Sequence, residues 1–141
     1  MQAAGKIPLS LEDLGCDALA VSAHKIGGPM GVGAFVVRAG LVVPPCITGG
    51  GQELGRRGGS ENVSGIVGFG LAAELSAGEL ASGAALAGKR DRMESDLRAA
   101  MPDIRIFGAD APRLPNTSYF GLAGLHGETV VMALDLAGIS V

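Results

Sequence analysis

The sequence has few of the residues that build nucleic-acid surfaces, disulfide frameworks or metal sites. Its 141 residues include no Trp, one Tyr and two Cys, and charged residues make up 18% of the chain with a net charge of −3. That charge balance excludes the basic surface that nucleic-acid binding requires. Two isolated cysteines are too few for a disulfide framework or a zinc site, so we expect structural roles for Cys16 and Cys46.

Long uninterrupted hydrophobic runs are also missing, because glycine or a charged residue interrupts each apolar stretch well before 18 residues. We therefore expect no membrane-spanning helix. The opening residues 1–6 lack a charged segment followed by an apolar one, so we expect no secretory signal peptide. The expectation is a cytoplasmic protein that binds neither membrane nor nucleic acid.

Glycine, in contrast, is abundant. The chain has 24 glycines, more than twice the ordinary usage of about 7%. Many lie in two loops, residues 27–33 and 49–59, where glycine allows positive φ and close approach of a ligand to the backbone. Gly65, Gly68 and Gly70 fall inside a helical pattern, where each costs about 1 kcal/mol relative to Ala. We expect them to permit tight packing against another helix or subunit.

The hydrophobic pattern predicts an α/β chain with a boundary near residue 78. The predicted elements are a helical turn at 10–14 with Ser10 as N-cap, strands at 17–21 (buried), 32–38, 104–107, 117–122 and 139–141, a helical region from about 62 to 101 with a break between 78 and 83, and a helix at 127–137.

The tetrapeptide Ser22-Ala23-His24-Lys25 ends the apolar run 18–21 and precedes a glycine-rich loop. Ligands of open α/β sheets bind just beyond the carboxyl ends of strands. A lysine there can form a Schiff base with a carbonyl cofactor, and Ser and His can hold a phosphate. This set indicates pyridoxal phosphate. Four residues alone also fit a solvated lysine at the end of a strand.

Two longer stretches carry a family resemblance. SAHKIGGPMGVGAFVVR and GGGQELGRRGGSENVSGIVGFGLAAE resemble the NifS/IscS-type cysteine desulfurases, which belong to the class V aminotransferase branch of pyridoxal-phosphate enzymes. The likeness continues through RLPNTSYF and GETVVMALD and covers essentially the whole chain in the family's order. The SxHK motif is shared across class V, whereas the GGGQExGxRxG(S/T)EN string is more specific to desulfurases.

The resemblance implies the fold-type I architecture of pyridoxal-phosphate-dependent transferases. Residues 1–78 would be the end of the large cofactor-binding domain, and residues 79–141 would be an incomplete small C-terminal α+β domain. Because family members are much longer, we interpret the chain as an internal fragment.

The same resemblance implies a role for five residues. Lys25 matches the catalytic Schiff-base lysine, and Ser22 and His24 match residues that contact the cofactor phosphate. Gln2 matches a glutamine that hydrogen-bonds the ring hydroxyl. Ser60 matches a threonine that reaches the phosphate of the neighbouring subunit in a homodimer.

Simpler roles remain open for some residues. Ser60 could cap the helix that follows it, Gln2 could be frayed at the terminus, and His126 fits a solvated turn. Arg57 matches an arginine whose role is not assigned. The spacing of glycines in 49–59 is similar to nucleotide-binding loops, but no strand precedes it as a Rossmann unit requires.

For the intact parent, the resemblance implies conversion of L-cysteine to L-alanine. Sulfur would pass to an enzyme persulfide and then to a scaffold or carrier protein, for Fe–S cluster or thio-cofactor assembly. The family's pyridinium-binding aspartate, stacking histidine, nucleophilic cysteine and carboxylate-binding arginine match no residue of these 141, so we expect the chain alone to be inactive. The alternatives are another class V enzyme, such as an aminotransferase or a selenocysteine-lyase-like protein, and a non-catalytic remnant without cofactor.

Overall fold

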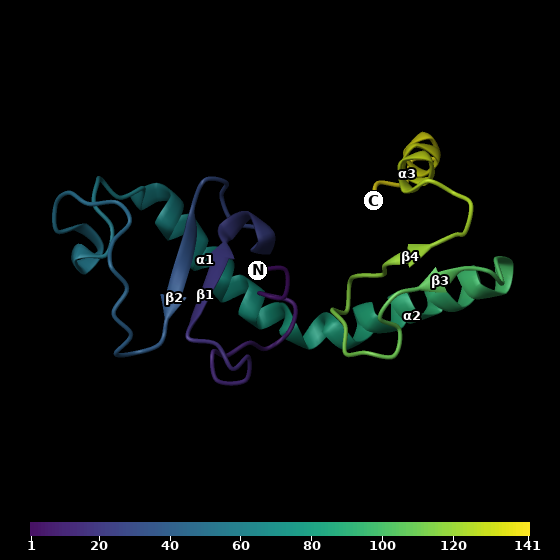
Figure 1. Cartoon of the computed structure of the whole chain (residues 1–141), viewed down its shortest axis with the longest axis horizontal. Coiled ribbons are helices and arrows are strands. Elements are labelled where there is room, and N and C mark those ends of the chain that lie inside the picture. The colour runs from purple at the N-terminus through teal and green to yellow at the C-terminus, as the bar shows by residue number, and fades with distance from the viewer. The chain divides into compact units, whose positions relative to one another are not determined.

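The computed structural model describes all 141 residues, which form two compact units, Met1–Ala81 and Ser82–Val141. The division lies close to the predicted boundary at residue 78. That these units correspond to a large and a small domain stays a prediction. The first unit contains strands β1 (Ala18–Ser22) and β2 (Gly33–Val37), the short 3-10 helices η1 (Ala23–Ile26) and η2 (Gln52–Gly55), and helix α1 (Val63–Glu79) (Figure 1).

In the first unit, β1 and β2 form an antiparallel pair that runs from Ala18 opposite Val37 to Ser22 opposite Gly33. Val21 on β1 and Phe35, Val36 and Val37 on β2 suit a pleated surface. At Gly33 the two backbones approach so closely that a Cβ would lie 2.6 Å from the carbonyl oxygen of Val21. Glycine is therefore required beside the end of β1, where the chain turns into η1.

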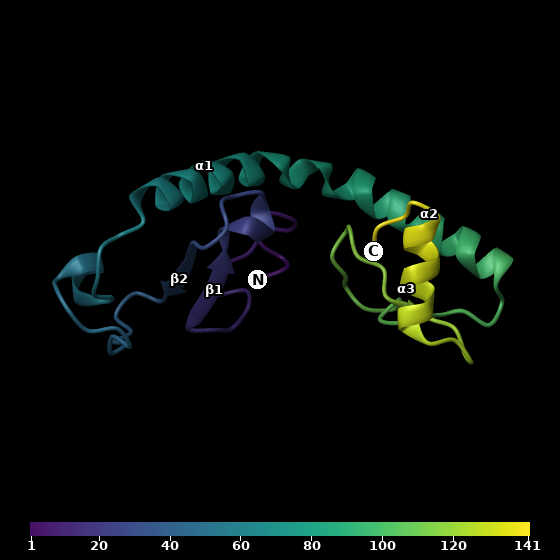
Figure 2. The same ribbon diagram turned by 90° about the horizontal axis from the view of Figure 1, so that it is seen from above.

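Helix α1 packs against η1 and the loop that follows it, as both views show (Figure 2). The contact depends on small residues. A Cβ on Gly28 would lie 3.2 Å from the Ala72 Cβ, and a Cβ on Gly68 would lie 2.8 Å from the Pro29 ring. Gly68 therefore permits tight packing within the chain, against Pro29. Beside Gly70 there is open space in the chain.

The second unit contains α2 (Gly83–Ala100), β3 (Arg105–Ile106), β4 (Phe120–Gly121) and α3 (Gly127–Leu136). β3 and β4 pair antiparallel. The Glu94 carboxylate of α2 accepts two hydrogen bonds from the Arg113 guanidinium, at 2.6 and 3.0 Å. Arg90 donates to the carbonyl oxygen of Leu114 at 2.7 Å. Two arginines therefore join α2 to the segment that leads to β4.

The strands are shorter and less covered than the sequence predicts. β3 and β4 have two residues each in place of the predicted 104–107 and 117–122, and residues 139–141 form no strand. β1 is half-exposed, so the prediction of a buried strand is wrong. Both ladders contain only two strands, and a strand without neighbours on both sides gains little pairing and little cover.

The predicted break between the long helices is confirmed as a 3-10 turn at Leu80–Ser82. Residues 10–14 form a turn in which the Ser10 hydroxyl accepts from Asp13 N at 3.0 Å.

Little of the chain is buried. The buried apolar residues are Ala23, Ala72 and Ile104, and the accessible surface is 10152 Å². By the size scaling of folded proteins, two separate compact units of about 7 kDa each would expose only about 8,100 Å². The accessible surface of the chain therefore exceeds that of two compact units, whatever their relative placement. Large apolar side chains such as Leu54 and Val42, 91% and 89% exposed, remain open to contact with other protein surfaces.

One helical run, Val63–Ala100, has the length and apolar composition of a membrane span, with a mean hydropathy of 1.2 over 18 residues. The expectation that the chain has no membrane-spanning helix stays a prediction. Length and composition alone are weak evidence, since core helices of soluble proteins meet the same criterion.

Candidate functional site

The predicted cofactor lysine lies on a short turn that starts where β1 ends. Ser22 is the last residue of β1, and η1 carries His24 and Lys25. The turn is fixed through Ala23, which is fully buried. Its N–H donates to the carbonyl of Val32 at 3.1 Å, and its carbonyl accepts from the N–H of Gly28 at 2.9 Å. These two hydrogen bonds of Ala23 therefore fix the backbone of the turn that carries Lys25.

The polar side chains of this turn are available to a ligand. Lys25 is half-buried and His24 exposed, and neither side chain forms a hydrogen bond or ion pair with the rest of the chain. The Ser22 hydroxyl donates only to the Met1 sulfur, at 3.5 Å. A thioether is a weak acceptor, so a stronger acceptor would displace it. The structure thus brings together three of the five predicted residues.

Gln2 lies in an exposed turn at the start of the chain. The bond between Met1 and Ser22 brings the first residues to the end of β1. The Gln2 side chain has no hydrogen bond within the chain, so its predicted contact with a ring hydroxyl stays a prediction.

Ser60 does not cap α1. The N-cap is Asn62, whose side-chain oxygen accepts from the N–H of Gly65 at 3.1 Å. Gly65 is buried beneath this cap, and a Cβ there would lie 2.5 Å from the Asn62 amide nitrogen. The simpler explanation for Ser60 is therefore wrong. Its hydroxyl is exposed and has no hydrogen-bond partner in the chain.

Ser60 is also distant from the lysine of its own chain. The η1 turn and its following loop pack beside Gly68 and Ala72 of α1, whereas Ser60 precedes the first residue, Val63. At 1.5 Å per residue, Val63 lies about 13 Å along the helix axis from Ala72. Figures 1 and 2 agree, with η1 beside the middle of α1 and the loop that carries η2 at its start. Ser60 therefore lies before the first turn of α1, whereas the lysine turn lies beside the middle of the same helix.

The loop before Ser60 has features that the sequence does not predict. Glu53 and Leu54 adopt left-handed backbone conformations, with φ of 52° and 57°. The side-chain oxygen of Gln52 is buried without a hydrogen-bond partner. Arg57 donates from Nη1 to the carbonyl oxygens of Gly59 and Ser60, at 3.2 and 3.1 Å. No spacing rule indicates these contacts, because they depend on the path of an irregular loop.

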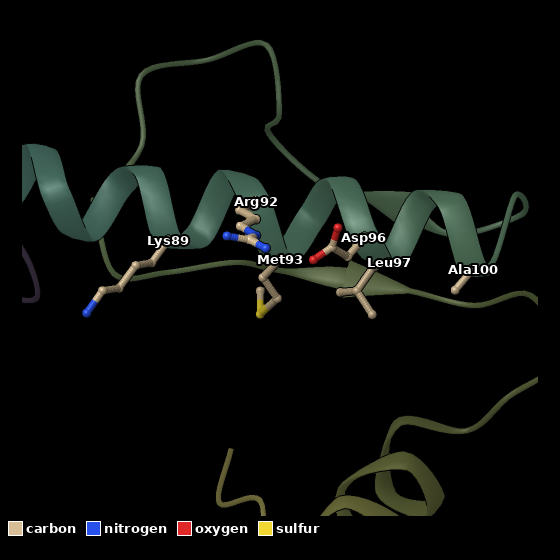
Figure 3. A pocket seen from close by; sticks show the side chains of 6 residues that line it. All are labelled: Lys89, Arg92, Met93, Asp96, Leu97 and Ala100. Carbon is tan, nitrogen blue, oxygen red and sulfur yellow. The ribbon is translucent and has the colours of Figure 1, made fainter.

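Other candidates do not form a site. Cys16 is half-buried and Cys46 is exposed, and both are free thiols. His126 is exposed at the N-cap of α3 and its side chain accepts no cap hydrogen bond, as expected for a turn residue. A hollow on one face of α2 contains none of the predicted residues (Figure 3). It is lined by Lys89, Arg92, Met93, Asp96, Leu97 and Ala100.

Comparisons with a family model and with curated proteins point to the same family. A family model described as aminotransferase class-V matches residues 1–141. A cysteine desulfurase of Cereibacter sphaeroides is 46% identical over 141 residues, which is all of this chain and 36% of that protein. A cysteine desulfurase of Nostoc sp. (strain PCC 7120) is 44% identical over 140 residues, 99% of this chain and 35% of that protein. The chain therefore spans about 36% of the length of the curated relatives it matches.

Solved structures agree with this comparison. A NifS-like protein superposes with a TM-score of 0.90 at 39% identity, covering 100% of this chain and 38% of that one. A NifS-like protein from Rickettsia africae superposes with a TM-score of 0.91 at 33% identity, covering 100% of this chain and 39% of that one. These neighbours confirm the predicted α/β fold of the fold-type I class.

Proposed function

The chain belongs to the class-V aminotransferase family, and we propose that it is the lysine-bearing part of a pyridoxal-phosphate-dependent cysteine desulfurase. One observation carries the proposal: Ser22, His24 and Lys25 lie together at the end of β1 with side chains that are free of strong partners. Its relatives named cysteine desulfurase are 46% and 44% identical over this same region.

The residues present fit pyridoxal phosphate. Ser22 supplies a hydroxyl donor, His24 an imidazole N–H donor and Lys25 a primary amine, all within four residues of a fixed turn. Hydroxyl and imidazole N–H groups are donors for a phosphate, and only an amine can join the aldehyde. When bound, the cofactor supplies that aldehyde and a ring that withdraws electrons from the substrate. Gln2 would hydrogen-bond the ring hydroxyl.

We assign two tasks to Lys25. Its amine would hold the cofactor in the resting protein. Once the substrate amine takes its place, Nζ would accept a proton from the substrate Cα and return it later. Lys25 is half-buried on the η1 turn. Ser22 and His24 would orient the phosphate while the proton moves.

The proposed substrate is L-cysteine and the proposed products are L-alanine and sulfur. A cysteine thiolate of the enzyme would attack the substrate sulfur and form a persulfide. The bond between that sulfur and the substrate Cβ would break, its electron pair would stay with the carbon fragment, and protonation of that fragment would give L-alanine. We do not assign this role to Cys16 or Cys46, because neither matches the family position of the nucleophile. Sulfur would then pass to a scaffold or carrier protein for Fe–S cluster or thio-cofactor assembly. We propose a cytoplasmic location for the reaction.

We also propose a homodimer in which Ser60 completes the phosphate site of the partner. The support is positional. The Ser60 hydroxyl has no partner in its own chain, and Val63 lies about 13 Å along α1 from Ala72, which packs beside Gly28 in the loop that follows η1. Exposed apolar side chains such as Leu54, 91% exposed, give a second copy a surface to cover.

The proposed function is tested by locating the bound cofactor. The chain is mixed with pyridoxal phosphate, reduced with borohydride and digested, and the labelled lysine is identified by peptide mass. We expect the label on Lys25 and not on Lys6 or Lys89, the two other lysines. Label distributed over all three lysines would contradict a built site.

The dimer is tested with a mixed species made from Lys25→Ala and Ser60→Ala chains. The one site that retains Lys25 then receives Ser60 from its partner, so we expect that site to bind cofactor with wild-type affinity. The matched control is the Ser60→Ala homodimer, in which affinity should be weaker. If the mixed dimer is as weak as that homodimer, Ser60 acts within its own chain.

A further inference from the structure

Arg57 follows η2 and precedes the residues that lead into α1. We propose that Arg57 is a positioning residue. Its guanidinium orients the backbone of Gly59 and Ser60 so that Ser60 and the peptide N–H groups beside it face an incoming phosphate. The inference rests on the proposed function for the identity of the phosphate, but the positioning itself is a property of the chain.

The first argument is the contact geometry. Nη1 of Arg57 donates to two successive carbonyl oxygens, those of Gly59 at 3.2 Å and Ser60 at 3.1 Å. Hydrogen bonds from an ionised donor are stronger than neutral ones. The guanidinium therefore fixes the orientation of two adjacent peptide groups just before the helix.

The second argument follows from the planarity of the peptide bond. The chain has no cis peptide bonds, and a trans peptide carries its N–H and C=O on opposite sides. When Arg57 holds the carbonyls of Gly59 and Ser60, the N–H groups of Ser60 and Glu61 must point away from the guanidinium. Neither N–H has an acceptor within the chain. Two backbone donors and the Ser60 hydroxyl are thereby left available on a short stretch.

The third argument is that the neighbouring glycines accommodate the arginine. Gly59 has a φ of 90°, and a Cβ there would lie 3.2 Å from Arg57 Nη1. Gly58 is buried, and its N–H donates to the carbonyl of Ile47 at 2.8 Å. A Cβ on Gly58 would lie 2.7 Å from the Thr48 carbonyl oxygen. The hydrogen bond from Gly58 to Ile47 therefore closes the loop, and Arg57 orients the two residues that follow Gly58.

Arg56 offers a matched control. It is the adjacent residue, it is exposed and carries the same charge, and its side chain forms no hydrogen bond or ion pair in the chain. Removal of either arginine changes the net charge equally. A difference between Arg57→Ala and Arg56→Ala therefore reports the two carbonyl contacts and not the general electrostatic attraction of a phosphate.

The first measurement uses the cofactor-free chain. Backbone order parameters of Ser60 and Glu61 are determined by ¹⁵N NMR relaxation. We expect values of about 0.85 in the wild type and in Arg56→Ala, and values below about 0.6 in Arg57→Ala. Arg57→Lys, which keeps a donor of the same charge, should restore part of the order. Equal order in Arg57→Ala and Arg56→Ala overturns the proposal.

The second measurement separates positioning from direct contact with the phosphate. Affinity for pyridoxal phosphate is measured for Arg57→Ala alone and in the Ser60→Ala background. Positioning predicts a loss of about tenfold alone and a smaller loss, of about threefold, when the Ser60 hydroxyl is already removed, because only the two peptide N–H groups then remain for Arg57 to orient. Equal losses in both backgrounds indicate direct contact and overturn the proposal.

The two proposals fail separately. If the wild-type chain binds no pyridoxal phosphate, the proposed function is wrong, whereas the order parameters still decide whether Arg57 orients Ser60. If the wild type binds the cofactor and Arg57→Ala behaves as Arg56→Ala does, the proposed function stands and the role of Arg57 is wrong.

Discussion

The first unit leaves its chemically active side chains without partners, and the second unit pairs its own. In the first, the side chains of His24, Lys25 and Ser60 form no hydrogen bond within the chain. In the second, Glu94 is 5% exposed and accepts two hydrogen bonds from Arg113. An unpaired group can bind a ligand, whereas a buried ion pair mainly fixes the structure around it. The comparison supports the proposed cofactor site in Met1–Ala81 and a structural role for the ion pair of Ser82–Val141.

The largest expected effect is at Lys25. Lys25→Ala should abolish the covalent attachment of pyridoxal phosphate that remains after borohydride reduction, because no other amine lies on the η1 turn. Lys89→Ala, in the second unit, is the matched control and should retain full attachment. The measurement is the mass of the intact reduced protein. Attachment that survives Lys25→Ala but is lost in Lys89→Ala would reverse the comparison between the units.

Next in size is removal of the ion pair in the second unit. Glu94→Gln leaves the Arg113 charge without its carboxylate, and we expect a loss of about 2–3 kcal/mol in the free energy of unfolding. This is below the range for a fully buried pair, because the Arg113 side chain is 17% exposed. Urea unfolding followed by circular dichroism measures the loss.

Asp96→Asn is the control, since Asp96 is exposed on the same helix and forms no ion pair. It should change stability by less than about 0.5 kcal/mol. Cofactor attachment at Lys25 should be retained in Glu94→Gln under conditions where the chain remains folded. A selective loss of attachment in the folded variant would show that the second unit takes part in the site.

The same pair predicts how stability depends on pH. Hydrogen bonds from Arg113 lower the pKa of Glu94 from 4.5 to about 2, against the opposing effect of burial. The folded state then binds this proton less tightly than the unfolded state. The stabilisation is complete above about pH 4.5 and is lost as the pH falls toward 2, by about 2 kcal/mol. In Glu94→Gln this part of the acid dependence should be absent, as measured by urea unfolding at pH 5 and pH 2.5.

The smallest expected effects concern two glycines of α1. Gly68→Ala places a Cβ 2.8 Å from the Pro29 ring, so α1 must shift from the loop that follows Lys25. We expect a net loss of about 1 kcal/mol in stability, since overpacking exceeds the gain in helix propensity. Gly70→Ala meets open space and should gain about 1 kcal/mol in a monomeric chain. Both values come from thermal or urea unfolding.

The dimer proposal adds a condition to the Gly70 result. If the space beside Gly70 is filled by a second copy, Gly70→Ala should weaken dimer association while it stabilises the monomer. Sedimentation at several concentrations distinguishes the two effects. Gly68→Ala with unchanged stability would contradict the packing of α1 against Pro29.

The sequence alone predicted the order and type of the main elements and the position of the lysine turn. Helices α1, α2 and α3 and strands β1 and β2 lie within a few residues of their predictions. Helical spacing and β-branched runs are local signals. Predictions based on them agree with the structure because neighbouring residues alone determine them. The SxHK motif placed Lys25 at a strand end for the same reason, since strand and turn are adjacent in the chain.

Only the tertiary structure decided which polar groups have partners. One of these contacts is local: the N-cap of α1 is Asn62 and not Ser60, a pairing between residues three apart that the sequence prediction missed. The pairing of Glu94 with Arg113 joins residues 19 apart, which no short-range pattern contains. The sequence determined what this chain carries, namely a lysine, donors for a phosphate and flexible glycines. The structure decided which of them remain free, because hydrogen bonds form between residues that folding brings together and the order of the sequence does not specify those contacts.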